Sequence, residues 1–345
     1  MTFQISVQPS GRGFVAQAGE VILTAAIREG VGLPYGCKDG ACGSCKCHMD
    51  SGSVVHGTHQ AKALTAEEEA AGFVLTCCAI PQSDVVLTSR QVTDAGAFPI
   101  KKMPVRVSTV NRVSTDVVAL KMQLPAADAF QYHAGQYVEF LLRDGDRRSY
   151  SMANAPHNQG TPAGLELHIR HMPGGKFTDH VFGALKEKDI LRIEGPYGSF
   201  FLREDSEKPL VFLASGTGFA PIKALLEHMQ FKDIERPVAV YWGGRRPSDL
   251  YMHDWMQAQA ACMPNLTYVP VVSDAPLQDA WVGRTGFVHH AVLADFADLS
   301  GHEVYACGAP VVVDSARADF TAQRALPPDA FYADAFTSAA DKAAN

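Results

Sequence analysis

The pattern of apolar and polar positions changes character twice along the 345-residue chain. In the first part, short alternating runs at residues 3–7 and 85–87 predict strands, and residues 21–29 have the spacing of a helix. These elements are typical of a small α+β domain.

The middle part is dense in short runs with strand character. They lie at residues 105–107, 117–120, 137–141, 165–169 and 190–193. Several short strands at such spacing predict a closed antiparallel β-barrel.

The third part has a different rhythm. Residues 210–214 form a continuous apolar run, as expected for a parallel strand covered on both faces, and a stretch with helical spacing follows. Further apolar runs at 238–242, 266–271 and 304–307 alternate with helical stretches, which predicts a doubly wound α/β domain. The turn-rich residues 93–99 and the charged residues 203–209 separate the three parts. We therefore expect domains at 1–95, 104–203 and 204–345, with a linker at 96–103.

Composition places the chain among soluble globular proteins. It is 47% hydrophobic and 19% charged, has no run of 18 apolar residues, and does not begin with a basic stretch followed by an apolar one. These features predict no membrane span and a cytoplasmic location. Eight cysteines, four of them clustered at metal spacing, fit a reducing compartment better than a disulfide framework.

The charge distribution narrows the range of partners. The net charge is −7, and only residues 104–203 are basic, with 12 Lys and Arg against 10 Asp and Glu. The acidic total argues against nucleic-acid binding, whereas a basic middle part suits bound phosphates. The sequence leaves the oligomeric state open and is compatible with a monomer.

Cysteine spacing gives the most specific chemical signal. Cys37, Cys42 and Cys45 follow the pattern C-x4-C-x2-C, and a fourth ligand lies at Cys77 or Cys78, as in a plant-type [2Fe–2S] site. Glycines 36, 40 and 43 let the backbone curl and aim N–H groups at sulfur.

Two other metal centres compete with this interpretation. A zinc site usually has two separated C-x2-C pairs, and this chain has one. A Rieske centre needs two histidine ligands, and its C-x-H half is absent. Cys47 is better explained as a small buried thiol. The neighbouring His289 and His290 have no further ligand at metal spacing and receive no role.

A glycine turn marks the third part. Gly216, Thr217 and Gly218 stand between a buried strand and a predicted helix, where backbone N–H groups and the helix dipole favour a pyrophosphate. Pro221 occupies the place of the third glycine in the G-x-G-x-x-G fingerprint. An ordinary strand-to-helix turn is the alternative.

Several motifs, in their order along nearly the whole chain, resemble the ferredoxin-reductase superfamily. They are Arg148-Ser149-Tyr150-Ser151, Gly174-Gly175-Lys176-Phe177-Thr178, Gly195-Pro196-Tyr197-Gly198-Ser199-Phe200, the run from Gly216 to Pro221, Tyr241-Trp242-Gly243-Gly244-Arg245, Cys307-Gly308-Ala309-Pro310 and Phe336. The first part resembles plant-type ferredoxins, which have a β-grasp fold, and this resemblance selects Cys77 as the fourth ligand. The arrangement is similar to reductase components of bacterial multicomponent oxygenases, and the flavin region to CDP-deoxyhexulose dehydratase reductases.

The resemblance implies a role for each motif. Expected cofactor-binding residues are Arg148, Ser149, Tyr150, Ser151, His168, Ile169, Arg170, Gly174, Gly175 and Thr178 for FAD, and Gly216, Thr217, Gly218, Pro221, Gly243, Arg245, Cys307, Gly308 and Pro310 for NADH. Expected at the hydride-transfer site are Tyr150, Ser151, Cys307 and Phe336, the last stacking on the flavin. Cys307 has no evident histidine base, so a packed thiol is favoured over a catalytic nucleophile at this position. For Phe336, the alternative to stacking on the flavin is ordinary apolar packing against a core.

The resemblance also implies the activity. NADH would reduce FAD, and the [2Fe–2S] cluster would pass electrons one at a time to a partner protein, either an oxygenase or a dehydratase component. NADPH stays open because Arg245 and Arg246 suit a 2′-phosphate. A non-catalytic alternative is a redox-sensing or docking subunit whose cofactor sites are vestigial. Such sites should have lost some of the glycines, arginines and cysteines that bind cofactors, and these residues are still present.

Overall fold

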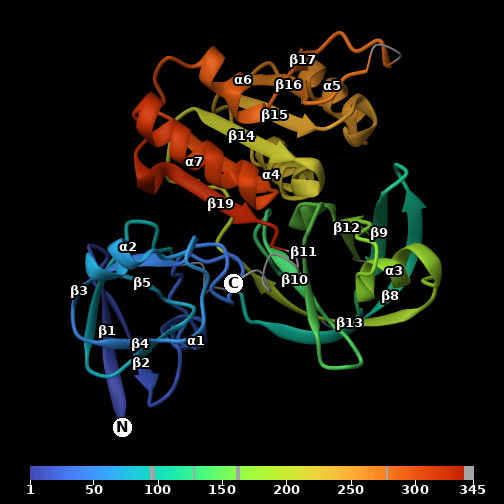
Figure 1. The fold of residues 1–345 in the computed structure, drawn as a ribbon. Coiled ribbons are helices and arrows are strands. Elements are labelled where there is room, and N and C mark those ends of the chain that lie inside the picture. Colours follow the sequence, from blue (N-terminus) through green and yellow to red (C-terminus); the bar gives the residue numbers. More distant parts are fainter. Residues whose placement is uncertain (94–97, 127–128, 161–163, 277–278, 338–345) are drawn as a thin grey trace. The chain divides into compact units, whose positions relative to one another are not determined.

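A computed structural model describes residues 1–345 except 94–97, 127–128, 161–163, 277–278 and 338–345. The described residues fall into two compact units. One comprises Met1–Pro99, Gly198–Phe200 and the chain from Ala333 onward, and the other comprises Ile100–Tyr197 and Phe201–Tyr332. The predicted barrel and α/β domain both lie almost entirely in the second unit (Figure 1).

The first unit is a mixed β-sheet with one main helix. Its strands are β1 (Thr2–Gln8), β2 (Arg12–Gln17), β3 (Lys46–Ser51), β4 (Val54–His56), β5 (Phe73–Leu75), β6 (Ala79–Pro81) and β7 (Val85–Thr88), and its helices are α1 (Ile22–Arg28) and α2 (Ala66–Ala70). The main sheet has the order β2-β1-β7-β3-β5, with β1 antiparallel to β2 and parallel to β7. Ile5, Val7 and Leu87 point into the core and are fully buried, which confirms the predicted α+β fold.

The middle part is the predicted antiparallel barrel. Its elements are β8 (Lys101–Arg112), β9 (Val117–Gln123), β10 (Tyr137–Leu141), β11 (Arg147–Ser151), β12 (Gly164–Arg170), β13 (Ile190–Tyr197) and α3 (Lys176–Gly183). The sheet order is β11-β10-β13-β8-β9-β12. An antiparallel bridge between Met152 and Leu167 joins its two end strands and closes the barrel.

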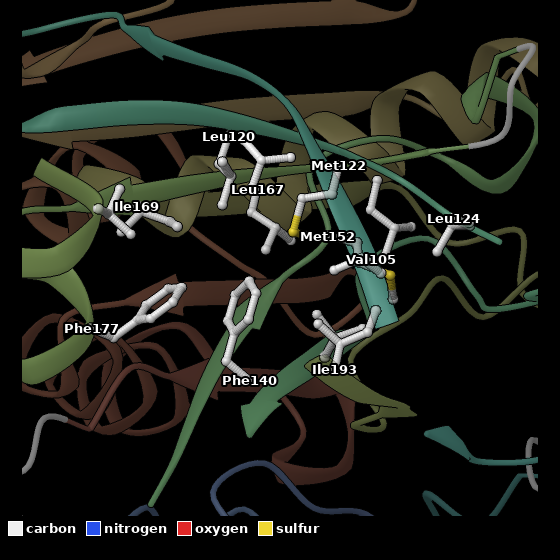
Figure 2. Close-up of a cluster of buried hydrophobic side chains, with 14 of the residues drawn as sticks. Val105, Leu120, Met122, Leu124, Phe140, Met152, Leu167, Ile169, Phe177 and Ile193 are labelled. Atoms are coloured by element: carbon white, nitrogen blue, oxygen red, sulfur yellow. The ribbon is translucent and has the colours of Figure 1, made fainter. Parts of the chain in front are cut away.

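Inward-facing side chains fill this barrel. Phe140 from β10 and Phe177 from α3 pack with ring centroids 4.3 Å apart, and Ile169, Leu167 and Met152 lie in the same cluster (Figure 2). α3 thereby covers one end of the barrel core. Its first turn, which carries part of a predicted flavin motif, is fixed by the buried ring of Phe177.

β8 begins at Lys101, inside the range expected to be a linker. Met103 is buried and pairs with Ile193 of β13. The start of this strand was hidden because its first two residues are lysines, the second of them exposed, and Lys101, Lys102 and Met103 give no apolar run. The boundaries of the three domains remain predictions.

The last part is a doubly wound α/β domain. Its elements are β14 (Leu210–Ser215), α4 (Phe219–Phe231), β15 (Val238–Gly244), α5 (His253–Cys262), β16 (Leu266–Val272), β17 (Arg284–Thr285), α6 (Val288–Asp295), β18 (Glu303–Gly308), α7 (Pro310–Arg324) and β19 (Phe331–Ala335). The sheet order is β17-β16-β15-β14-β18-β19, with β14 parallel to both β15 and β18. Strand order reverses between β14 and β18, and ligands of such sheets bind at the carboxyl ends of strands at this point.

Among the described residues, no helix has the length and apolar character needed to cross a membrane.

Candidate active site and cluster-binding loop

The four predicted iron ligands form two close pairs of cysteines. The Cys37 and Cys42 side chains hydrogen-bond each other, and the sulfurs of Cys45 and Cys77 are 3.2 Å apart. Two pairs of thiolates match a two-iron cluster, in which each iron takes two protein sulfurs. The residues present therefore fit the [2Fe–2S] group, and Cys77 as the fourth ligand stays a prediction.

Backbone donors face the sulfur atoms, as the glycine pattern predicts. The N–H of Cys37 donates to Sγ of Cys42 over 3.4 Å. The side chain of Cys37, together with hydrogen bonds from Ser44, lowers the pKa of Cys42 to about 6. Gly40 has φ +76°, and a Cβ there would lie 2.7 Å from Sγ of Cys78, so only glycine suits this turn.

The two further cysteines of this unit behave as packed thiols. Cys78 lies beside Cys77, with the sulfurs 3.5 Å apart, but it donates to the carbonyl of Thr58 over 3.6 Å. Cys47 is buried in β3, and burial raises its pKa to about 12. Both observations support the prediction that neither is a ligand.

In the second unit, an ion-pair chain brings the two predicted flavin motifs together. Arg148 on β11 lies 3.1 Å from Asp146, and Asp146 lies 2.8 Å from Nζ of Lys176 in the first turn of α3. Asp144 also binds Lys176, at 2.6 Å. Arg148 is 31% exposed, so its guanidinium can still reach a ligand phosphate.

The loop before α3 is shaped by hydrogen bonds to its own threonine. Oγ1 of Thr178 donates to the carbonyl of Met172 and accepts from the N–H of the same residue. A Cβ at Gly175 would lie 2.6 Å from this hydroxyl, and Gly174 has φ +82°. Asp179 in the first turn of α3 accepts the N–H of Gly174 over 3.1 Å, so a phosphate at this helix end would share or replace the carboxylate as acceptor. Thr178 itself is engaged by the loop, so its predicted hydroxyl contact to the flavin requires a shared hydrogen bond.

Tyr150 and Ser151 lie at the end of β11 beside the barrel core. The Tyr150 ring packs against those of Phe140 and Phe177, with centroids 5.8 and 5.4 Å apart, and burial raises the pKa of its hydroxyl. Ser149 pairs with Glu139 of β10, and Ser151 with Tyr137. The aromatic wall fits a planar ring system.

The turn predicted to bind the nucleotide, Gly216–Gly218, packs its backbone directly on the backbone at the end of β18. Gly216–Gly218 forms one turn of 3-10 helix after β14, and a Cβ at Gly218 would lie 2.3 Å from the carbonyl oxygen of Cys307. Gly308 has φ +120°, and a Cβ there would lie 2.4 Å from the carbonyl oxygen of Ser215. The ends of β14 and β18 therefore meet as the resemblance implies, at the switch point of the sheet.

Cys307 is fully buried, and its thiol donates to the carbonyl of Gly218 over 2.6 Å. This contact supports a packed thiol at the turn rather than a nucleophile. Thr217 lies within the turn, and Pro221 is buried in the first turn of α4, where a missing N–H costs no helical bond. Pro310 has the corresponding position at the start of α7.

β12 joins the flavin side to the nucleotide side. Its Arg170 binds Asp116 at 2.7 Å, and the same guanidinium lies 3.2 Å from where a Cβ of Gly216 would be. Ile169 points into the barrel core. The His168 side chain is fully buried, with Nδ1 2.9 Å from the Tyr251 hydroxyl and Nε2 3.0 Å from Glu166. Both ring nitrogens of His168 are thus occupied by protein, which leaves its backbone for the predicted role beside the flavin.

Sequence reasoning missed a buried charge network next to this strand. Nζ of Lys223 on α4 lies 2.6 Å from Glu227, 3.4 Å from Glu166 and 3.0 Å from the carbonyl of Ala153. Burial opposes ionisation of Glu166, but its hydrogen bond to His168 and the charge of Lys223 outweigh burial and lower the pKa of Glu166 to about 2. The network ties the barrel to the α/β domain. No local signal in the sequence pairs these distant residues.

Replacing Lys223 with Met should destabilise the second unit by about 3–5 kcal/mol, because two carboxylates would stay buried without their cation. Since the pKa of Glu166 in the folded protein, about 2, is below the ordinary value of 4.5, its contribution is complete above pH 4.5 and is lost as pH falls toward 2. The difference in free energy of unfolding between the parent and Lys223→Met should therefore become smaller as the pH falls from 4.5 toward 2. Urea unfolding followed by tryptophan fluorescence measures it, because all three tryptophans lie in this unit.

Lys121→Met is the matched control. Nζ of Lys121 also lies 3.4 Å from Glu166, but the Lys121 side chain is 59% exposed. We therefore expect Lys121→Met to lower the free energy of unfolding by less than about 1 kcal/mol. Equal losses for the two variants would contradict a dominant role of the buried lysine.

The remaining predicted residues lie in two places. Gly243, at the end of β15, packs against Val288, and Arg245 and Arg246 follow it as exposed residues. The backbone N–H groups of both arginines donate to Asp249, which orders this turn. Phe336 belongs to the first unit and Tyr150 to the second, and the predicted stacking of Phe336 on the flavin stays a prediction.

Three family models match consecutive parts of the chain. They describe a 2Fe-2S iron-sulfur cluster binding domain over residues 5–82, an oxidoreductase FAD-binding domain over 104–202 and an oxidoreductase NAD-binding domain over 212–318. The three matches confirm the predicted fold classes and the predicted cofactors.

Similar proteins span the whole chain. A CDP-6-deoxy-L-threo-D-glycero-4-hexulose-3-dehydrase reductase of Yersinia pseudotuberculosis is 41% identical over 97% of this chain and 99% of its own length. A terephthalate 1,2-dioxygenase reductase component of Comamonas is 34% identical over 98% of each chain. The crystal structure of an Amycolatopsis cytochrome P450 reductase covers 97% of this chain and 99% of its own, with 32% identity and a TM-score of 0.78. The chain therefore belongs to the ferredoxin–NAD(P)H reductase superfamily, as an iron–sulfur flavoprotein reductase with a [2Fe–2S], an FAD-binding and an NAD-binding domain.

Proposed function

We propose that this reductase takes electrons from NADH at the turn formed by Gly216–Gly218 and Cys307–Gly308, and delivers them to a partner protein from the cluster held by Cys37, Cys42, Cys45 and Cys77. The observation that supports the proposal is that Arg170 lies beside Gly216, so β12, which carries predicted flavin residues, adjoins the turn predicted to bind the nucleotide. Cysteines spaced as cluster ligands, not as a disulfide framework, support a cytoplasmic location.

When bound, nicotinamide supplies a hydride, FAD converts this electron pair into single electrons, and the cluster carries them one at a time. The protein contributes position and electrostatics. Arg148 and the N–H groups at the start of α3 would hold the FAD phosphates, and the rings of Phe140, Tyr150 and Phe177 would exclude water beside the barrel. Cys307 holds the predicted nucleotide turn in place by donating its thiol hydrogen bond to the carbonyl of Gly218.

Replacing Arg148 with Ala should weaken FAD binding by about 10- to 100-fold, because a charged hydrogen-bond donor to phosphate is worth about 1.5–3 kcal/mol. The dissociation constant for FAD, measured by flavin fluorescence on the deflavinated protein, checks this value. Arg143→Ala is the matched control, since Arg143 is an exposed arginine between β10 and β11 outside the motif. A loss equal to that of the control would reject the phosphate role.

The choice of nucleotide is a separate proposal. NADH is favoured because Asp249 accepts the backbone N–H groups of Arg245 and Arg246, so an acidic group stands beside the arginines that would otherwise attract a 2′-phosphate. We expect kcat/KM for NADH to exceed that for NADPH. A higher kcat/KM for NADPH would reverse the assignment.

An anaerobic titration tests the proposed function directly. NADH should bleach the flavin and then the cluster absorbance, and turnover should reduce ferricyanide and cytochrome c. Absence of flavin bleaching with either nucleotide would overturn the proposal and favour the docking subunit.

The acceptor is proposed from the relatives. Those at about 41% identity are reductases of a CDP-hexulose dehydrase, and those at about 34% serve dioxygenases. Reduced protein mixed with a purified dehydrase component, and in parallel with an oxygenase component, should reoxidise rapidly with one of them. Equally slow reoxidation with both would point to a different partner.

A further inference from the structure

The packing of α6 against α7 brings together two histidines and an aspartate that lie about thirty residues apart in sequence. His289 and His290 stand in the first turn of α6, and Asp319 stands in α7. One ligand atom from each of the three lies within 4.8 Å of the other two. Nε2 of His289 is 3.6 Å from Oδ2 of Asp319. None of the three belongs to the flavin, nucleotide or cluster sites.

The surroundings of the cluster fix two of the three side chains. The His289 side chain is 10% exposed, and its buried Nδ1 has no hydrogen-bond partner among the described residues. Gln323, one turn further along α7, donates to Oδ1 of Asp319 over 2.9 Å, which leaves Oδ2 turned to His289. Carboxylates that bind metal ions are commonly held by such a hydrogen bond, so Gln323 orients Asp319 for the role of a ligand.

His290 supplies the exposed side of this cluster. His290 is exposed and lies with its ring centroid 4.2 Å from that of His289. On the side of His290 the three-residue cluster is open to solvent, so a metal ion could enter there and keep a water ligand.

We propose that His289, His290 and Asp319 form a site for a divalent transition-metal ion, with Zn²⁺ as the best match. Two imidazoles and one carboxylate form a donor set that zinc takes with water as the fourth ligand. The hard ions Mg²⁺ and Ca²⁺ prefer oxygen donors and fit this set poorly. A bound ion would cross-link α6 to α7 and stabilise the α/β domain by mass action.

The test uses the FAD- and cluster-loaded protein with Cys262 replaced by Ser, because Cys262 is an exposed thiol that would itself take zinc. Isothermal titration with Zn²⁺ should give one site of micromolar affinity, and Mg²⁺ should give none. His290→Ala and Asp319→Asn should each weaken the affinity for Zn²⁺ at least tenfold. The cluster absorbance, followed in parallel, reports whether the iron ligands stay out of the reaction.

His228→Ala is the matched control. Nε2 of His228 lies 2.8 Å from Glu204, so it is a histidine–carboxylate pair of the same unit outside the three-residue cluster, and its removal should leave the affinity for Zn²⁺ unchanged. Zn²⁺ should also raise the melting temperature of the parent protein and not that of His290→Ala. Absence of stoichiometric binding, or equal affinity in the parent, His290→Ala and Asp319→Asn, would overturn the proposal.

Discussion

Replacing Cys42 with Ala is expected to lower cytochrome c reduction at least tenfold while ferricyanide reduction by NADH stays within about twofold of the parent. Cys42 is the partner of Cys37 and accepts the N–H of that residue. Without its sulfur one iron has a single protein ligand, and the cluster is lost. Ferricyanide can still oxidise the flavin, whose proposed binding residues lie in the other unit.

Iron content, cluster absorbance and the two rates measure this outcome on the same preparation. Cys78→Ser is the matched control, because Cys78 adjoins the fourth ligand but donates to Thr58, and a serine hydroxyl can keep that bond. The control should retain its iron. Parallel loss of both activities in Cys42→Ala would show that the division of labour between cluster and flavin is wrong.

Replacing Gly218 with Ala should reduce kcat/KM for NADH at least 100-fold and destabilise the second unit by about 3 kcal/mol. The added Cβ would lie 2.3 Å from the carbonyl oxygen of Cys307 and 2.8 Å from Cα of Gly308. Both atoms belong to backbone, which cannot rotate away as a flexible side chain would, so the ends of β14 and β18 must separate. FAD content should stay near that of the parent, because the flavin motifs lie on other elements.

Stopped-flow reduction of the flavin by NADH and urea unfolding check these values. Gly301→Ala is the control: it makes the same change in the same domain, where a Cβ meets nothing within 4 Å. Normal flavin reduction in Gly218→Ala would contradict the assignment of this turn to the nucleotide.

Elements with a strong apolar rhythm could be predicted from the sequence. The expected strand at residues 137–141 coincides with β10, and the run at 210–214 forms most of β14. β11, which carries the flavin motif, has no such rhythm, because Arg147, Arg148 and Ser149 pair with β10 through their backbone. In its first three residues the strand character follows from pairing with β10, and only Tyr150 and Ser151 at its end lie against the core.

In the candidate site, too, some residues could be predicted from the sequence and others could not. Cysteine spacing and glycine turns are local signals, because a tight loop imposes its residue types over a few positions. The Lys223–Glu166 pair and the His289–Asp319 pair join elements that meet only after the sheet and helices have packed. A charged residue in a sequence window looks like a solvated one until its tertiary neighbours are known.

The network around Lys223 has a consequence for motion. It links α4 to the barrel through Ala153 and Glu166, while Arg170 of β12 lies against Gly216. A hinge between the flavin and nucleotide parts would have to pull a buried ammonium away from its carboxylates, at a cost of several kcal/mol. The second unit is therefore expected to meet NADH as a preorganised receptor, so that binding is followed by hydride transfer without a preceding closure step.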